Sequence, residues 1–159
     1  MPIAFFLIQA LAAASPAVPA CPLSRAQYRL ADDAAITARF DPGREGNIVT
    51  IADGHDGRSF RFALVAGSRQ LGQQLRFVGA TGRNGTRLDY RPDYFRLARG
   101  FFFARDKTMV PGAAPSMAPP YFFPSGLTNA LYTAGAERPQ DARSYVPAGM
   151  FVLSGCRRA

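Results

Sequence analysis

The strongest constraint on the fold of this 159-residue chain is the position of its two cysteines. Cys21 directly follows an apolar leader, and Cys156 lies three residues before the last residue of the sequence. A disulfide between them would close the folded chain into one long loop, which in the entropic model stabilises the native state by about 5 kcal/mol. An unpaired thiol would be exceptional in an oxidising compartment, so we expect a Cys21–Cys156 disulfide.

The leader, MPIAFFLIQALAAASPAVPA, predicts export. Its apolar run from Ile3 to Ala14 has the length of a signal-peptide core, and Val18-Pro19-Ala20 offers the small residues behind which a signal peptidase cuts. The run is too short to span a bilayer, which takes roughly 20 apolar residues. We therefore expect a cleaved signal peptide at 1–20 and a single exported β domain at 21–159, periplasmic or secreted.

The alternative is a lipoprotein anchored at Cys21. A cysteine directly after the cleavage site is how bacterial lipoproteins are lipidated, and Val-Pro-Ala-Cys resembles their recognition motif. The two fates exclude each other, because a lipid-modified Cys21 has no thiol left to oxidise. Contact with a membrane is expected only in the lipidated case.

The charge balance is strongly basic and bears on the partner. The chain has 19 Lys and Arg against 11 Asp and Glu, for a net charge of +8. Such a surplus attracts anionic partners, although a GC-rich genome also enriches Arg, Ala, Gly and Pro. Because the export signal disfavours nucleic acid, we expect the partner to be an envelope protein or an anionic envelope polymer.

The hydrophobic pattern is typical of a mainly β protein. Apolar and polar residues alternate in short segments separated by Gly, Asp and Asn, and sustained helical periods are rare. We expect an antiparallel β-sandwich or barrel of about six to eight strands, with the choice between the two left open. The clearest strands are predicted at Ile36–Phe40, Ile48–Ala52, Phe60–Leu64, Gly100–Ala104 and Met150–Cys156.

A hairpin is predicted around Asn84-Gly85, the preferred pair for a two-residue type I′ turn. Centring the turn on this pair places Thr81 opposite Leu88 and Arg76 opposite Asp93. One face of the hairpin is then largely apolar, and the other carries the charges.

The first candidate binding segment runs from Met109 to Thr133, which contains five prolines and no charged residue. We expect it to form a long loop carrying Tyr121, Phe122 and Phe123. If these aromatic side chains are exposed, they offer an apolar contact to a partner. Otherwise the loop folds over one open end of the β domain and its aromatics complete the core.

The second candidate binding surface is the charged face of the predicted hairpin. Arg87 and Arg91 lie on its solvent side, where they could bind an acidic polymer or a negatively charged partner. Asp89 and Asp93 alternate with them, which also fits an ordinary solvated sheet face.

Signals for catalysis are few. His55, the single histidine, lies in the turn DGHDG between Asp53 and Asp56, where an imidazole and two carboxylates could serve a small hydrolase or a metal-dependent enzyme. The same residues are ordinary turn formers. The sequence contains no G-x-S-x-G, G-x-G-x-x-G or P-loop motif, and we assign no catalytic residue, metal site or cofactor. We expect a non-enzymatic binding domain; the enzyme and the lipid-anchored accessory protein remain as alternatives.

Overall fold

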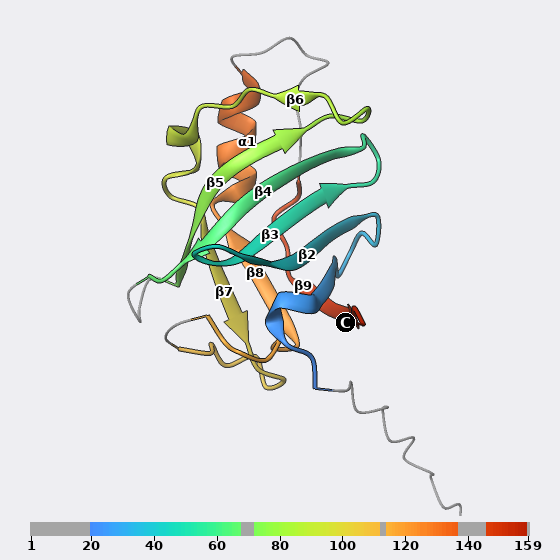
Figure 1. Ribbon diagram of the computed structural model, residues 1–159, viewed down its shortest axis with the longest axis vertical. Helices are drawn as coiled ribbons and strands as arrows, with labels where there is room; N and C mark the ends of the chain where they lie inside the picture. The colour runs from blue at the N-terminus through green and yellow to red at the C-terminus, as the bar shows by residue number, and fades with distance from the viewer. Residues whose placement is uncertain (1–19, 68–71, 112–113, 137–145, 159) are drawn as a thin grey trace, which may run out of the picture.

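A computed structural model describes residues 20–67, 72–111, 114–136 and 146–158. All but the last residue of the predicted leader lies outside this part of the chain. The described residues form a mainly β structure (Figure 1). Its elements are η1 (Leu23–Arg25), β1 (Ala26–Leu30), β2 (Ile36–Gly43), β3 (Gly46–Asp53), β4 (Arg58–Val65), β5 (Gln73–Thr81), β6 (Arg87–Leu88), η2 (Pro92–Phe95), β7 (Arg99–Phe103), β8 (Tyr121–Ser125), α1 (Leu127–Ala136) and β9 (Phe151–Cys156).

The sheet is a closed antiparallel barrel, which decides between the two expected architectures. Its strand order is β4-β3-β2-β1-β9-β8-β7-β5-β6, and an additional β4–β5 pairing joins the two ends. Eight strands close in this way, and the two-residue strand β6 pairs with one end of β5. Each barrel strand except β1 and β9 therefore lies between the strands that precede and follow it in the chain, and β9 returns to pair with β1. All five strands predicted above are present.

The barrel is filled by side chains because every strand alternates its residues between inside and outside. On β2, Ile36, Ala38 and Phe40 are fully buried, whereas Thr37 and Arg39 are exposed. Aromatic rings dominate the interior and form two groups, in which several pairs pack edge to face. The first group comprises Tyr28, Phe40, Phe102, Phe122 and Phe151; the second comprises Phe60, Phe62, Phe77, Tyr90 and Phe95.

One end of the barrel is covered by the connection between β7 and β8. The phenol of Tyr28 reaches it from inside and donates to the carbonyl oxygen of Pro119 at 2.8 Å. Burial raises the pKa of Tyr28 far above its usual value, so this hydroxyl remains a neutral donor. The amide of Ala118 donates to the carbonyl of Cys21 at 2.7 Å, which fastens the same connection to the start of the domain.

The prediction that Met109–Thr133 is one long loop is wrong for its second half. Residues Tyr121–Ser125 form strand β8, and the helix α1 begins at Leu127. The helix lies behind β4 and β5 in Figure 1 and buries Leu127, Ala130, Leu131 and Ala134 in the core. These four positions have the spacing of one helical face, which is why the segment forms a helix against the sheet.

The hairpin around Asn84-Gly85 exists, but its turn type and register differ from the prediction. The amide of Gly85 donates to the carbonyl of Gly82, and the amide of Gly82 donates to the carbonyl of Thr86. Gly85 alone in this loop has a positive φ, of 71°, so the turn is a three-residue type I loop ending in a glycine bulge. The extra loop residue shifts the register by one and pairs Thr81 with Arg87.

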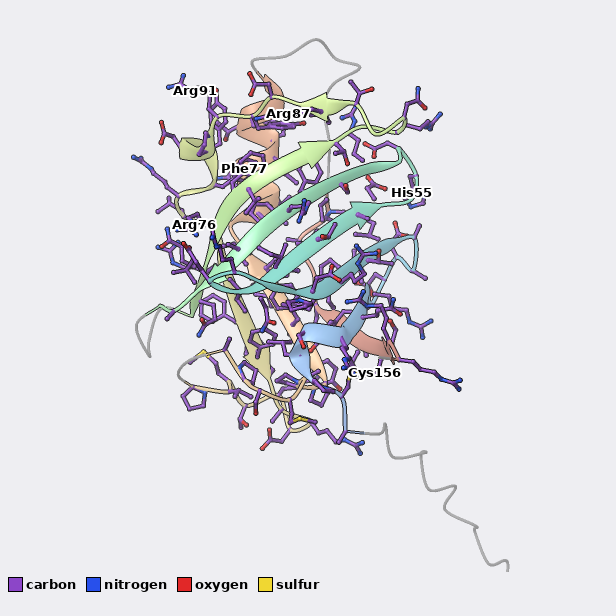
Figure 2. The ribbon with its side chains drawn as sticks, viewed as in Figure 1. His55, Arg76, Phe77, Arg87, Arg91 and Cys156 are labelled. Carbon is purple, nitrogen blue, oxygen red and sulfur yellow. A yellow bond between two sulfur atoms is a disulfide. The ribbon has the colours of Figure 1, made fainter. Side chains whose placement is uncertain are left out.

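The shift also changes the predicted charge pairing. Arg76, labelled in Figure 2, forms its ion pair with Glu45 in the β2–β3 turn. Asp93 instead belongs to η2. Phe77 packs inward, stacked on Phe95 at 4.5 Å between ring centroids.

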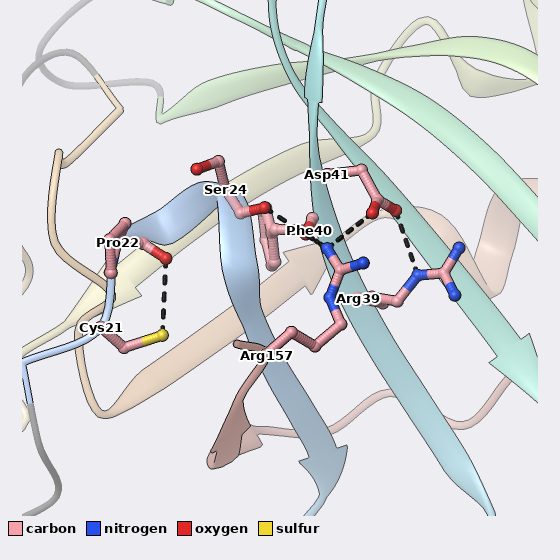
Figure 3. Close-up of polar contacts among 7 residues, drawn as sticks. All are labelled: Cys21, Pro22, Ser24, Arg39, Phe40, Asp41 and Arg157. Atoms are coloured by element: carbon pink, nitrogen blue, oxygen red, sulfur yellow. Dashed lines mark hydrogen bonds and ion pairs between the residues drawn. The ribbon is translucent and has the colours of Figure 1, made fainter. Parts of the chain in front are cut away.

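Both ends of the domain are fastened where β1 and β9 complete the barrel. The disulfide Cys21–Cys156 is present, with 5.7 Å between the two Cα atoms. The next residue, Arg157, extends a guanidinium Nη2 to Asp41 Oδ1 at 2.6 Å and to the carbonyl oxygen of Phe40 at 2.6 Å (Figure 3). A covalent and a charged link thus hold the C-terminal strand to η1 and β2.

We expect the double substitution Cys21→Ser/Cys156→Ser to lower the free energy of unfolding by about 2–5 kcal/mol, because it releases the loop constraint on the unfolded chain. Urea denaturation of the mature domain, followed by far-ultraviolet circular dichroism, measures this difference. The unsubstituted protein with its disulfide reduced serves as the control and should match the variant. Equal stability of oxidised and reduced protein would contradict the expectation.

Candidate functional site

The outer wall of the barrel carries the most distinctive arrangement of polar side chains. Strand register places six outward positions in one row across β1 to β6, with an arginine at each end and small residues between them. The hydroxyls of Ser59 and Thr81 are 2.7 Å apart, so both side chains lie on this face. The first row is Arg29, Thr37, Ala52, Ser59, Thr81 and Arg87.

A second row runs beside the first, two residues farther along each of the shared strands. It places Thr50 between Arg39 on one neighbouring strand and Arg61 on the other. Two strand spacings separate these arginines, which is about 10 Å between their backbones. The row begins at Gln27 on β1. We call the ten residues of the two rows the basic wall; it contains four arginines and no acidic residue.

A groove lies in the basic wall and runs across the strands from β9 to β4. Its volume is about 470 Å³, and it is open to solvent on one side. The buried Tyr28 and Ala38 contribute to its floor. Its other lining residues are Gln27, Thr37, Arg39, Thr50, Ala52, Ser59 and Ser154.

A β-bulge brings Ser154 into the groove. Along β1 and β9, Tyr28 pairs with Leu153 but Gln27 pairs with Gly155, so Ser154 is an extra residue on its strand. Bulges re-aim side chains in this way and are common beside functional sites. The Ser154 hydroxyl donates to the carbonyl of Gln27 at 3.1 Å.

The arginines of the basic wall differ in their pairing. Arg39 Nε is 3.1 Å from Asp41 Oδ2, and Asp41 also binds Arg157. Arg29, Arg61 and Arg87 are exposed, and their guanidinium groups form no hydrogen bond or ion pair with any other described residue. Three of the four guanidinium groups are therefore available to a ligand.

The two arginines expected from the sequence are both exposed but lie in different settings. Arg87, labelled in Figure 2, belongs to the end of the basic wall on β6. Arg91 lies in the connection before η2, with its guanidinium 5.8 Å from the ring centroid of Tyr94. Sequence analysis missed Arg29, Arg39 and Arg61. Their signal is the period-two alternation of their strands, which marks each as an outward position.

The three aromatic candidates are separated by the alternation of β8. Phe122 is fully buried and contacts four other rings of the barrel interior. Tyr121 and Phe123 are half-buried on the outer side, opposite Phe103 and Phe101 of β7. Phe122 therefore has no surface to offer a partner, whereas its two neighbours contribute to the outer surface.

The ring of His55 pairs with a carboxylate that the sequence did not single out. Its Nε2 is 2.8 Å from Asp33 Oδ2 in the β1–β2 connection. Asp53 Oδ1 instead accepts the backbone amide of His55, and Asp56 Oδ1 accepts the amide of Arg58. Asp53 and Asp56 thus act as turn formers. Among the described residues, no cluster of three or more His, Cys, Asp or Glu is placed to hold a metal ion.

No protein-family model, curated protein or solved structure matches this chain. Nor does any helix in the described ranges have the length and hydropathy needed to span a bilayer. Its function is therefore inferred from the geometry above.

The His55–Asp33 contact makes a pH-dependent prediction. The hydrogen bond that His55 Nε2 donates to the Asp33 carboxylate raises the pKa of His55 above its ordinary value of 6.5, and it lowers the pKa of Asp33. The stabilisation from protonated His55 is full below pH 6.5 and is lost as the pH rises through the raised pKa. The contribution of Asp33 is present above its ordinary value of 3.8 and is lost as the pH falls through the lowered one.

We expect Asp33→Asn to return the pKa of His55 toward 6.5, because it removes the carboxylate whose hydrogen bond contributes most to the raised pKa. An NMR titration of the imidazole resonances of this single histidine measures the change. Asp56→Asn is the matched control and should have a much smaller effect, since Asp56 acts on His55 only through weak charge attraction. An equal fall in both variants would show that the contact with Asp33 is not the main cause.

The aromatic residues of β8 give a stability prediction. We expect Phe122→Ala to lower the free energy of unfolding by about 3–5 kcal/mol, because it leaves a cavity among the rings of the barrel. Phe123→Ala should cost about 1 kcal/mol, since its half-buried side chain already contacts solvent. Urea denaturation of both variants provides the comparison, and equal losses would contradict the inward and outward assignments.

Proposed function

We propose that this protein is an exported, non-enzymatic binding domain that takes an anionic component of the cell envelope on its basic wall. The mature domain is 21–159, held by its disulfide and free of lipid. The ligand lies against the outside of the barrel, across strands β1 to β6.

The observation that carries the proposal is the absence of acidic residues from the basic wall. Four arginines share this face, and Arg29, Arg61 and Arg87 have no ion-pair partner among the described residues. Arg39 is paired with Asp41 beside the basic wall, so the three unpaired guanidinium groups provide the attraction for anions, which also accelerates their association. An ordinary solvated sheet face of this size would alternate both signs of charge.

The packing of the barrel supports an outer site. Large aromatic and aliphatic side chains with almost no exposure fill the interior, including Tyr28, Phe40, Phe62 and Phe122. Small barrels that carry ligands inside, such as lipocalins, need space at the centre. Here the space is on the outer wall, in the groove between Ser154 and Ser59.

The experiment is a binding titration of the mature domain with anionic polymers, starting with polygalacturonate and polyglutamate of equal charge. We expect the double substitution Arg29→Gln/Arg61→Gln to weaken binding of both polymers about five- to thirtyfold, from two exposed charge contacts of about 0.5–1 kcal/mol each. Binding should also weaken as the salt concentration rises, because exposed charges are screened.

The control is Arg105→Gln/Arg158→Gln, which removes the same net charge from exposed positions outside the basic wall. It should leave the affinity within about twofold. Equal losses in the two double variants would mean that net charge alone governs binding. Failure of every anionic polymer to bind would reject the proposed function.

A further inference from the structure

We infer that the groove of the basic wall binds a carboxylate-bearing polysaccharide, a polyuronate chain lying across the strands from β9 to β4. This inference rests on the proposed function and specifies its ligand. It is carried by two features that occur together: polar groups without partners inside the groove, and arginines that flank them.

The groove contains hydrogen-bonding side chains that the domain itself does not use. Three of these side chains have no hydrogen-bond partner among the described residues: the hydroxyls of Thr37 and Thr50 and the side-chain amide of Gln27. Thr37 is exposed, and Thr50 and Gln27 are half-buried. Each hydroxyl offers one donor and two acceptor sites, and the amide adds two donors and an acceptor. Such a lining complements a ligand with many hydroxyl groups.

The arginines select the charge of that ligand. Arg39 lines the groove; its Nε is bonded to Asp41, whereas its two Nη groups have no partner among the described residues. Arg61, whose guanidinium is unpaired in the described structure, lies opposite Thr50 on the adjacent strand. A guanidinium is planar and presents its donors in a fork that matches both oxygens of a carboxylate. A sugar chain in which carboxylates recur between hydroxyl groups would meet both kinds of side chain along one direction.

Other polyanions fit the groove less well. Peptides commonly bind to sheets by adding a strand to a free edge, and β1 to β4 are each paired on both sides. Single-stranded nucleic acids need exposed aromatic platforms for their bases. The only aromatic residue at the groove is Tyr28, which is fully buried and bonded to Pro119. A polymer rich in hydroxyl groups uses what remains, namely threonine, serine and glutamine side chains.

The test compares charge-matched oligomers of galacturonate and glutamate by isothermal titration calorimetry, with neutral dextran and polyphosphate as further probes. We expect the galacturonate oligomer to bind at least tenfold more tightly than each of the other three. The double substitution Thr37→Val/Thr50→Val removes two hydroxyls, keeps the β-branched shape and leaves the arginines in place. It should weaken galacturonate binding about tenfold and leave glutamate binding unchanged.

Thr133→Val is the matched control, because it removes an exposed hydroxyl on α1 and should leave galacturonate binding unchanged. Thermal unfolding of each variant verifies that the barrel is intact. Tighter or equal binding of polyglutamate or polyphosphate would overturn the polyuronate inference while leaving the proposed function standing. Equal binding of neutral dextran, or insensitivity to Thr37→Val/Thr50→Val, would also overturn it. If no anionic probe binds at all, the proposed function fails as well.

Discussion

The pairing of β1 with β9 is the constraint on which the rest of the molecule depends. These strands lie at opposite ends of the chain, so bringing them together costs loop entropy that only the completed barrel repays. The Cys21–Cys156 bond reduces that cost by constraining the unfolded chain. Arg157 adds a charged link, although its Nε is buried without a hydrogen-bond partner among the described residues. Closure also removes free edges from the strands that meet there, which protects the barrel from edge-to-edge aggregation.

Closure fixes the position of the candidate site as well. In a closed barrel the registers of all strand pairs are linked, and a slip of one residue would exchange inner and outer side chains. The rows of the basic wall exist because four consecutive pairings keep Arg29, Thr37, Ala52, Ser59 and Thr81 in line. The bulge at Ser154 interrupts the pairing at one end of the groove, and it falls in the β1–β9 pair that joins the first and last strands of the barrel. The interaction that stabilises the fold therefore also shapes the groove.

The sequence predicted single strands and the disulfide better than it predicted the hairpin turn and the helix. Alternation identified strands such as Ile36–Phe40, and the terminal cysteines predicted the disulfide. The sequence-based prediction failed for the β5–β6 hairpin. Asn-Gly fits a type I′ turn, but it also fits the last two positions of a type I loop with a bulge. The prediction also missed α1. Its apolar positions Leu127, Ala130, Leu131 and Ala134 have helical spacing, but the proline-rich residues before them led the whole segment to be interpreted as a loop. Prolines in the first half of that segment disfavour regular secondary structure there, but they do not prevent a strand and a helix from forming in the second half.

The candidate site was the least predictable part, because its residues come together only through the pairing of separate strands. Arg29, Arg39, Arg61 and Arg87 are spread over almost sixty residues, and nothing in their spacing along the chain connects them. They become neighbours only through the registers of β1 to β6. Arg91, four residues after Arg87, lies near it in sequence yet outside the basic wall, since the chain leaves the sheet at Leu88. Period-two patterns tell which side of a strand a residue occupies, whereas a binding surface on a barrel also requires knowing which residue stands beside it.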